Sequence, residues 1–325
     1  MVELLEKINI LDSYHYAYLA TRISGMKNRL VTQEKFKQML NCKSLDELPH
    51  FLENTDYKKI PYRNLEEASN FLDEYFIRLL KMICVFAPSA VKNFVFVLKE
   101  YAKLQDLKSK VKSVTDDKTF TDILSQITGN LQKTTDLKKI KEFKEFKKSI
   151  LSHIEKKEFS QIDYKLENEF FKSIKKTIDK RKLMIVKNFI KKRADIMNII
   201  IKMRSLLFGY DTDCYLDYGY IEVTKIKNQK SIDTLISSLK KTEYHGIFSK
   251  TVDEFNKTGN RDVLDNAMDE FLVEYLKNAK TSDPAGFGLV FWFILTKDRE
   301  IRELKALFKI ISDGLSKDYF EVFAW

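Results

Sequence analysis

The sequence predicts an all-α protein, and three observations support this. The chain of 325 residues contains only 9 glycines and 4 prolines, so long stretches can remain helical without interruption. Its apolar residues recur at spacings of three and four, which is the period of a helix rather than of a strand. A hydrophobic fraction of 44% beside 32% charged residues is typical of a globular chain. The length is sufficient for two or three domains.

The first part of the chain is expected to form helices separated by short polar breaks. Tyrosines in the first of these helices are interpreted as packing residues. Ser44 and Glu47 have the spacing of a capping box, which predicts a helix start at Ser44. The expected helices cover 13–30, 33–40, 44–52, 64–86, 89–110 and 120–127, with breaks before Pro88 and at Gly129-Asn130.

The middle of the chain becomes strongly charged. Residues 135–158 are expected to include an amphipathic helix with a basic outer face, and 163–204 one or two long helices. After Gly209, an irregular polar loop is expected through Tyr220. Its Asp211, Asp213 and Asp217 superficially resemble a calcium loop, but the central glycine and the terminal glutamate of such a loop are missing.

The last segment combines a turn with an apolar run. Asp283 is predicted to cap a helix that has Pro284 at its first position. The small residues Ala285, Gly286 and Gly288 would allow another helix to approach closely. We expect the run from Gly286 to Thr296 to be buried and the helix to continue, half charged, through Glu300 and Leu304.

An internal repeat is the clearest motif. The pattern L-x-x-T-acid-Y occurs at Leu52–Tyr57 and at Leu239–Tyr244, and a degenerate copy lies at Leu131–Thr134. In chain order, the copies at Leu131 and Leu239 are each preceded by an apolar helix that ends in a base, at 90–99 and 195–204 respectively. The separations from base to threonine are 33, 35 and 38 residues, taking Arg22 as the first base. These similar spacings predict three related subdomains, although a helical chain rich in Lys, Leu and Ile can also produce such similarities by chance.

The motif is interpreted as structural rather than catalytic. Thr55 and Thr242 are expected to cap the helix that follows, with Asp56 or Glu243 in its first turn. The tyrosine two residues after each threonine would pack back on the preceding helix.

Several classes of function find no support in the sequence. The net charge of +10 raises the possibility of nucleic-acid binding. However, the bases are interspersed with 47 acids and no nucleic-acid motif is present, so a solvated lysine-rich surface, or proximity to an anionic membrane, is favoured. The sequence contains no nucleotide-binding or hydrolase motif, and its four histidines have no metal-ligand spacing. We therefore assign no catalytic, cofactor-binding or metal-binding residue.

The cellular context is inferred from cysteines and hydropathy. The chain has three cysteines, Cys42, Cys84 and Cys214, an odd number without the spacing of a zinc site. Neither a disulfide framework nor a zinc site is therefore indicated, and we expect a reducing cytoplasm. The charged start at Met1 does not have the pattern of a signal peptide. The most apolar run, 286–296, has about half the length that a membrane helix needs.

Taken together, these segments resemble a known family. The Asp-Pro-x-Gly-x-Gly-Leu-Val segment that starts at Asp283, followed by the Lys-x-Arg-Glu-x-x-x-Leu helix from Lys297, is similar to the C subunit of archaeal and bacterial V/A-type ATPases, a relative of the d subunit of the vacuolar enzyme. The similarity extends to Tyr16-Ala17-Tyr18-Leu19 with Arg22 and Leu30, to the motif at Leu52, and to the helices of Asn93 and Asn198. Ala20 departs from the frequent asparagine, and 135–182 match in helical character only.

The resemblance implies a funnel of three similar all-α subdomains, for which we expect boundaries at 1–88, 89–193 and 194–325. It also implies a non-catalytic subunit of the central stalk, or rotor. The expected partners are the proteolipid ring of the membrane sector and the central axle subunits, so that rotation is coupled to proton or sodium transport or to ATP synthesis. The protein would then lie peripherally at the cytoplasmic face of the membrane, associated through the ring, with no cofactor, nucleic acid or small-molecule substrate. The alternative is a helical adaptor or nucleic-acid-binding module built from the same repeats.

Overall fold

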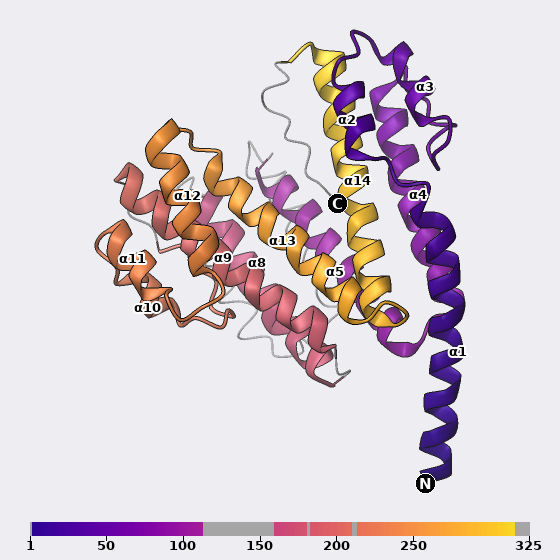
Figure 1. The fold of residues 1–325 in the computed structure, drawn as a ribbon, viewed down its shortest axis with the longest axis horizontal. Coiled ribbons are helices and arrows are strands. Elements are labelled where there is room, and N and C mark those ends of the chain that lie inside the picture. Colours follow the sequence, from indigo (N-terminus) through magenta and orange to yellow (C-terminus); the bar gives the residue numbers. More distant parts are fainter. Residues whose placement is uncertain (1, 113–158, 181–182, 210–212, 316–325) are drawn as a thin grey trace. The chain divides into compact units, whose positions relative to one another are not determined.

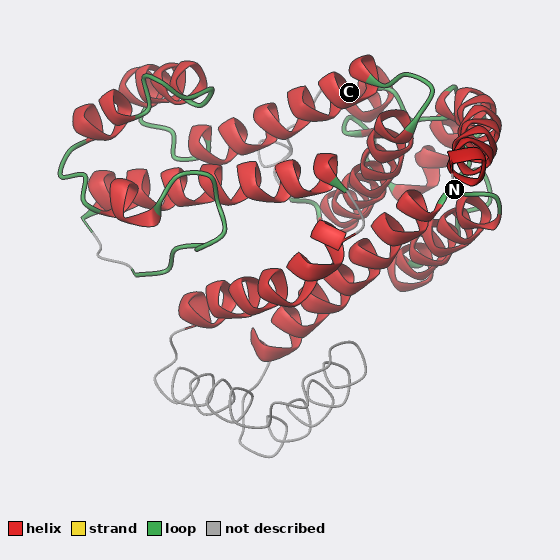
Figure 2. Cartoon of the chain, turned by 90° about the horizontal axis from the view of Figure 1, so that it is seen from below, coloured by secondary structure: helices red, strands yellow, loops and turns green. Residues whose placement is uncertain are grey.

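The computed structural model describes residues 2–112, 159–180, 183–209 and 213–315. All regular secondary structure in these ranges is helical, which confirms the all-α prediction (Figure 2). The helices expected within 120–127 and 135–158, the motif copy at 131–134 and Asp211 lie outside the described residues. None of the helices in the described ranges is long and apolar enough to cross a membrane.

The chain divides into two compact units. Unit 1 comprises residues 1–95 and 269–325, and unit 2 comprises residues 96–268. The division falls within α5 (Ser89–Lys112) and within α13 (Val263–Ser282). The three subdomain boundaries expected from the sequence remain a prediction.

Unit 1 joins the two ends of the sequence. Its other helices are α1 (Val2–Lys27), α2 (Gln33–Met39), α3 (Leu48–Leu52), α4 (Leu65–Val85) and α14 (Phe287–Asp313), with a short 3-10 turn η1 (Leu45–Glu47) before α3. The C-terminal α14 packs against α4 and α1 (Figure 1). Four residues of α14 complete a core whose other buried members come from the first quarter of the chain: Ile301, Leu304, Leu307 and Phe308. An N-terminal core therefore depends on the last helix described.

Helix starts in unit 1 follow local side-chain chemistry in some places and not in others. Asn64 caps α4, and its Oδ1 accepts hydrogen bonds from the backbone N–H groups of Glu66 and Glu67, as expected for a helix start at this point. The predicted capping box at Ser44 is wrong. The Ser44 side chain makes no capping bond, and Glu47 instead accepts a bond from the N–H of Lys43.

The turn between α13 and α14 explains the small residues of the last segment. A Cβ atom on Gly288 would lie 2.2 Å from the carbonyl oxygen of Ala279, so the close approach predicted there is present. Oδ2 of Asp283 accepts a hydrogen bond of 2.9 Å from the Gly288 N–H. However, α14 begins at Phe287, so Pro284 lies in the turn and not at the first helical position. The apolar run that follows is buried from Gly288 to Ile294, as predicted.

Unit 2 is built on two long helices. These are α8 (Phe159–Lys180) and α9 (Met184–Phe208), which pack together. A loop then leads to α10 (Val223–Lys227), α11 (Ile232–Ser238) and α12 (His245–Thr258). Both α10 and α11 pack on α9. Gly209 ends α9 with a φ of 72°, a left-handed conformation that favours glycine.

Candidate functional site

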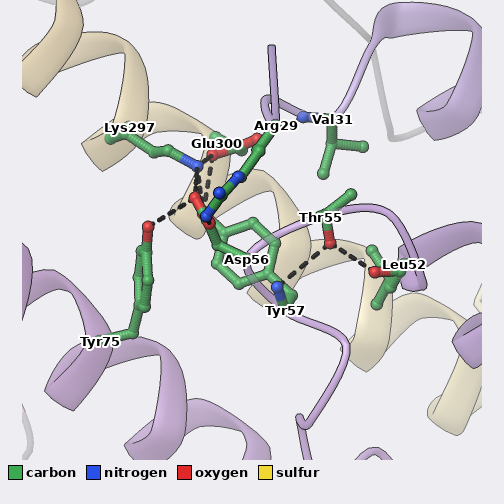
Figure 3. Close-up of polar contacts among 9 residues, drawn as sticks. All are labelled: Arg29, Val31, Leu52, Thr55, Asp56, Tyr57, Tyr75, Lys297 and Glu300. Atoms are coloured by element: carbon green, nitrogen blue, oxygen red, sulfur yellow. Dashed lines mark hydrogen bonds and ion pairs between the residues drawn. The ribbon is translucent and has the colours of Figure 1, made fainter. Parts of the chain in front are cut away.

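The first copy of the repeated motif forms a tight turn after α3. The Thr55 hydroxyl donates a 2.7 Å hydrogen bond to the carbonyl of Leu52 and accepts one of 3.1 Å from the Tyr57 N–H (Figure 3). The prediction that Thr55 caps the following helix is therefore wrong, since α4 begins eight residues after Tyr57 with Asn64 as its cap. The threonine instead closes its own turn and fixes the direction of the Tyr57 side chain.

Tyr57 points to a buried carboxylate on α14. Its hydroxyl donates a 2.7 Å hydrogen bond to Oε2 of Glu300, which also forms a 2.8 Å ion pair with Lys297. The other oxygen, Oε1, accepts a hydrogen bond from the N–H of Val31 in the segment after α1. The side chains of Lys297 and Glu300 are both 0% exposed. One carboxylate thus joins three segments that are far apart in the sequence.

Asp56 extends this network toward the surface. Its Oδ2 lies 3.2 Å from Nζ of Lys297 and accepts a 2.7 Å hydrogen bond from the Tyr75 hydroxyl, while Oδ1 lies 3.4 Å from Arg29 (Figure 3). Lys297 and Arg29 together balance the charges of Asp56 and Glu300. We call Lys297, Glu300, Asp56, Tyr57 and the Val31 N–H the first latch, because the side chains hold the motif against α14.

Burial governs the ionisation of the first latch. It raises the pKa of Glu300 above the ordinary glutamate value, although Lys297 and the donors from Val31 and Tyr57 act in the opposite direction. Burial, and then the neighbouring Glu300, raises the pKa of Tyr57 well above 10, so its hydroxyl remains a donor at neutral pH. These polar groups are bonded to one another, which suits them to holding helices in place.

The second copy of the motif repeats this arrangement in unit 2. The Thr242 hydroxyl donates a 2.8 Å hydrogen bond to the Leu239 carbonyl and accepts one of 3.3 Å from the Tyr244 N–H. The Tyr244 hydroxyl then donates a 2.8 Å hydrogen bond to Oδ2 of Asp195 on α9. Here too the predicted capping role is wrong, because α12 begins at His245 without a side-chain cap.

The hydrogen bonds to Asp195 resemble those to Glu300, but the neighbouring ion pair is more exposed, since the Glu243 side chain is 48% exposed and that of Asp56 only 10%. Asp195 accepts hydrogen bonds of 3.0 and 2.9 Å from the N–H groups of Tyr220 and Ile221, in the segment before α10. Lys192, three residues before Asp195, forms a 2.6 Å ion pair with Glu243, just as Lys297 pairs with Asp56. Burial raises the pKa of Asp195, opposed by the donors from Ile221, Tyr244 and Tyr220. We call Lys192, Asp195, Glu243 and Tyr244, with these two N–H groups, the second latch.

Comparison with known proteins places this arrangement in a family. A family model described as ATP synthase (C/AC39) subunit matches residues 19–322, which include both latches. The chain belongs to this family.

Several curated relatives cover nearly the same length. The C subunit of the A-type ATP synthase from Thermococcus kodakarensis is 22% identical, over 95% of this chain and 90% of the relative. The proteins of the same name from Methanocaldococcus jannaschii and Pyrococcus horikoshii are each 24% identical, over 92% of this chain and 84% and 87% of the relative, respectively.

This member of the C/AC39 family has a further buried ionic cluster in unit 2. Glu167 on α8 pairs with Lys108 at 2.7 Å and Arg193 at 3.2 Å, and accepts a 3.1 Å hydrogen bond from the Tyr218 hydroxyl. Burial alone would raise the pKa of Glu167, but Arg193 and Lys108 outweigh it and the pKa is lowered. The cluster ties α5, α8 and α9 to the loop before α10.

The sequence locates the motifs of this C/AC39 chain but not their acceptors. Within the sequence, Asp195 and Glu300 stand out only as members of apolar helices, and Lys192 does not stand out at all. The two sites share one pattern, a lysine three residues before a carboxylate next to an apolar stretch of the same helix. Asn198 has a more specific structural role than the sequence predicts. Its side-chain amide donates a 2.8 Å hydrogen bond to the Leu216 carbonyl and accepts one of 2.8 Å from the Leu216 N–H.

Metal binding finds no support in the described part of the chain. No three residues of the types His, Cys, Asp and Glu gather there as metal ligands would. Asp213, from the sequence that resembles a calcium loop, forms an ion pair with Lys227.

Proposed function

We propose that this chain is a non-catalytic central-stalk subunit of a V/A-type rotary ATPase. It would be a socket that couples the central axle to the proteolipid ring of the membrane sector. The observation that carries the proposal is the family match over 19–322, together with relatives along nearly the whole chain that are named as C subunits of A-type ATP synthases. The protein would transmit rotation, in proton or sodium transport or in ATP synthesis, and carry out no chemistry itself.

The latches suit a mechanical role. A subunit that transmits torque must resist local rearrangement, and a hydrogen-bonded ion network buried between helices has few alternative arrangements. In unit 1 such a network holds the segment from Val31 to Tyr57 on α14, and in unit 2 another holds Tyr220 to Tyr244 on α9. We propose that a third copy completes a funnel whose polar cavity receives the axle.

The charge balance suits the proposed location. The chain has 57 basic and 47 acidic residues, so it carries a net charge of +10. Such a surface at the cytoplasmic face of the membrane would be attracted to acidic ring loops and to anionic head groups, an attraction that salt weakens. Reversing the charge of several surface lysines should therefore weaken association with the ring and reduce its salt dependence.

Affinity purification from solubilised membranes tests the proposal. A tagged chain expressed in its own cells should co-purify with the proteolipid ring and the axle subunits, and without nucleic acid. A tagged, unrelated basic helical protein serves as the control for charge-driven capture. Recovery of the chain with nucleic acid, or with neither ring nor axle subunits, would contradict the proposal and favour the helical adaptor or nucleic-acid-binding alternative.

A further inference from the structure

Unit 1 contains a groove between α1 and α4 that the latch does not fill. Its volume is about 560 Å³. One wall is the C-terminal part of α1 and the other is α4, and Asp56 and Tyr75 of the network in Figure 3 also line the groove. The lining residues are Arg22, Gly25, Met26, Arg29, Asp56, Tyr75, Arg78, Leu79 and Met82.

The three arginines of the groove differ in their partners. Arg29 pairs with Asp56, and Arg78 lies 3.4 Å from Glu74 on the same helix. Arg22 forms no ion pair with any described carboxylate. Its guanidinium instead donates to the Tyr18 hydroxyl at 2.7 Å and to Sδ of Met82 at 3.1 Å.

A guanidinium in this position can accept an anionic partner. It has five N–H donors, it is always charged, and its planar geometry matches a carboxylate. A thioether sulfur is a weak acceptor, so a carboxylate would be the stronger partner for the N–H that now points to Met82. Since Asp56 is already compensated by Lys297 and Arg29, Arg22 contributes an uncompensated positive charge to the groove.

Gly25 supplies a second, independent indication. It lies in the last turn of α1, where alanine is the better helix former. A Cβ atom at this position would meet no heavy atom within 4 Å, so the packing of the chain does not require a glycine there. Glycine does permit another backbone to approach closely. Met26 and Met82 beside it have flexible side chains that can adapt to an incoming segment.

We infer that this groove binds an acidic segment of another subunit of the ATPase, with an Asp or Glu carboxylate on Arg22 and the backbone of the segment over Gly25. The inference deepens the proposed function and rests on it for the source of the segment. A peptide is favoured over a phosphate group because the groove combines one uncompensated arginine with a glycine and the apolar side chains of Met26, Leu79 and Met82, whereas phosphate surfaces gather many uncompensated bases.

Site-specific photo-cross-linking in the assembled complex tests the source of the segment. A benzoylphenylalanine replaces Arg78, an exposed residue of α4 that lines the groove, so that Arg22 and Gly25 stay unchanged. A second chain carries it at the exposed Glu34 of α2 as the matched control. Irradiation of the purified complex, followed by mass spectrometry, should join position 78 to one peptide of another subunit that contains Asp or Glu within a few residues of the link. The additional change Arg22→Glu should reduce the yield at least about tenfold, as expected when a hydrogen-bonded charge pair is lost.

Binding of a defined probe tests the chemistry separately. Fluorescein-labelled hexaglutamate, followed by anisotropy with the purified full-length chain, should bind about tenfold more weakly to the Arg22→Glu variant. It should also bind more weakly to Gly25→Trp, whose indole would fill the groove. Lys81→Glu makes the same change of charge on an exposed residue of α4 that does not line the groove, and should change binding less than about threefold.

The outcomes separate this inference from the proposed function. Cross-links from position 78 to lipid, to nucleic acid or to a peptide without acids would overturn the inference, as would equal weakening by Arg22→Glu and Lys81→Glu. Absence of any cross-link in a complex that retains ring and axle subunits would also overturn it, while leaving the proposed function intact. A chain that purifies without any ATPase subunit would instead contradict the proposed function.

Discussion

Removing one hydroxyl from the first latch should destabilise unit 1 by a measurable amount. The change Tyr57→Phe keeps the ring and removes the 2.7 Å hydrogen bond to Glu300. A hydrogen bond to a charged group contributes about 1.5–3 kcal/mol. Because Oε2 keeps its ion pair with Lys297 and Oε1 keeps the Val31 N–H, the carboxylate is not left without partners. We therefore expect a loss of about 2 kcal/mol in the free energy of unfolding.

The fluorescence of Trp292 offers a direct assay. The chain has two tryptophans, so a background with Trp325→Phe leaves only Trp292, which is buried in unit 1 with 5% exposure. Urea titration of this background, with and without Tyr57→Phe, measures the loss of stability. Tyr14→Phe is the matched control, because Tyr14 is 71% exposed and should change stability by less than about 0.5 kcal/mol.

A double-mutant cycle with Glu300→Gln isolates the bond itself. If Tyr57 acts through Glu300, the coupling energy between the two changes should be about 1–2 kcal/mol. A loss for Tyr57→Phe no larger than that for Tyr14→Phe, or a coupling energy below about 0.5 kcal/mol, would refute the role of the latch.

Three further changes test the other features of unit 1. Lys297→Met leaves the buried Glu300 without its ion-pair partner, while the less buried Asp56 keeps Arg29. It should cost about 3–5 kcal/mol in urea unfolding, and a cost below about 1 kcal/mol would contradict a buried ion pair. Gly288→Ala places a Cβ 2.2 Å from the Ala279 carbonyl oxygen and should lower the free energy of unfolding, measured by calorimetry, by about 1–3 kcal/mol. Gly246→Ala is the control, because its Cβ would lie in open space and should not destabilise the chain. Burial raises the pKa of Glu303 from 4.5 to about 7, so the folded state binds this proton more tightly than the unfolded chain does. Its contribution to stability is therefore full below about pH 4.5 and is lost as the pH rises through 7, and Glu303→Gln should stabilise the protein at about pH 8 by up to about 3 kcal/mol. Parallel unfolding curves for this variant and the parent chain between about pH 5 and 8 would contradict the assigned titration.

Local chemistry made most of the helices predictable. Asn64 offers a short polar side chain directly before an apolar periodic run, so the start of α4 could be expected within one residue. The start of α14 was less predictable. The sequence Asp283-Pro284 has the form of a cap followed by a first helical residue, but Gly288 must lie against Ala279, and α14 begins at Phe287, after an intervening turn.

The threonines show the limit of local inference. Thr55 and Thr242 carry the side chain of a helix cap, and an acid follows each of them, which is also a helix-start signal. A threonine hydroxyl can equally bond within its own turn, and that alternative occurs at both positions. The sequence identified the repeated motif correctly and assigned it the wrong hydrogen bonds.

The sequence by itself determined the all-α class, the family and the two copies of the motif, because helical periodicity and short patterns are properties of neighbouring residues. Only the tertiary structure decided which carboxylate each tyrosine meets. Tyr57 and Glu300 are separated by 243 residues, so no local preference links them. Their interaction also depends on burial, which excludes water, raises the pKa of Glu300 and makes an unpaired charge costly. That environment exists only once α14 has packed against the first quarter of the chain.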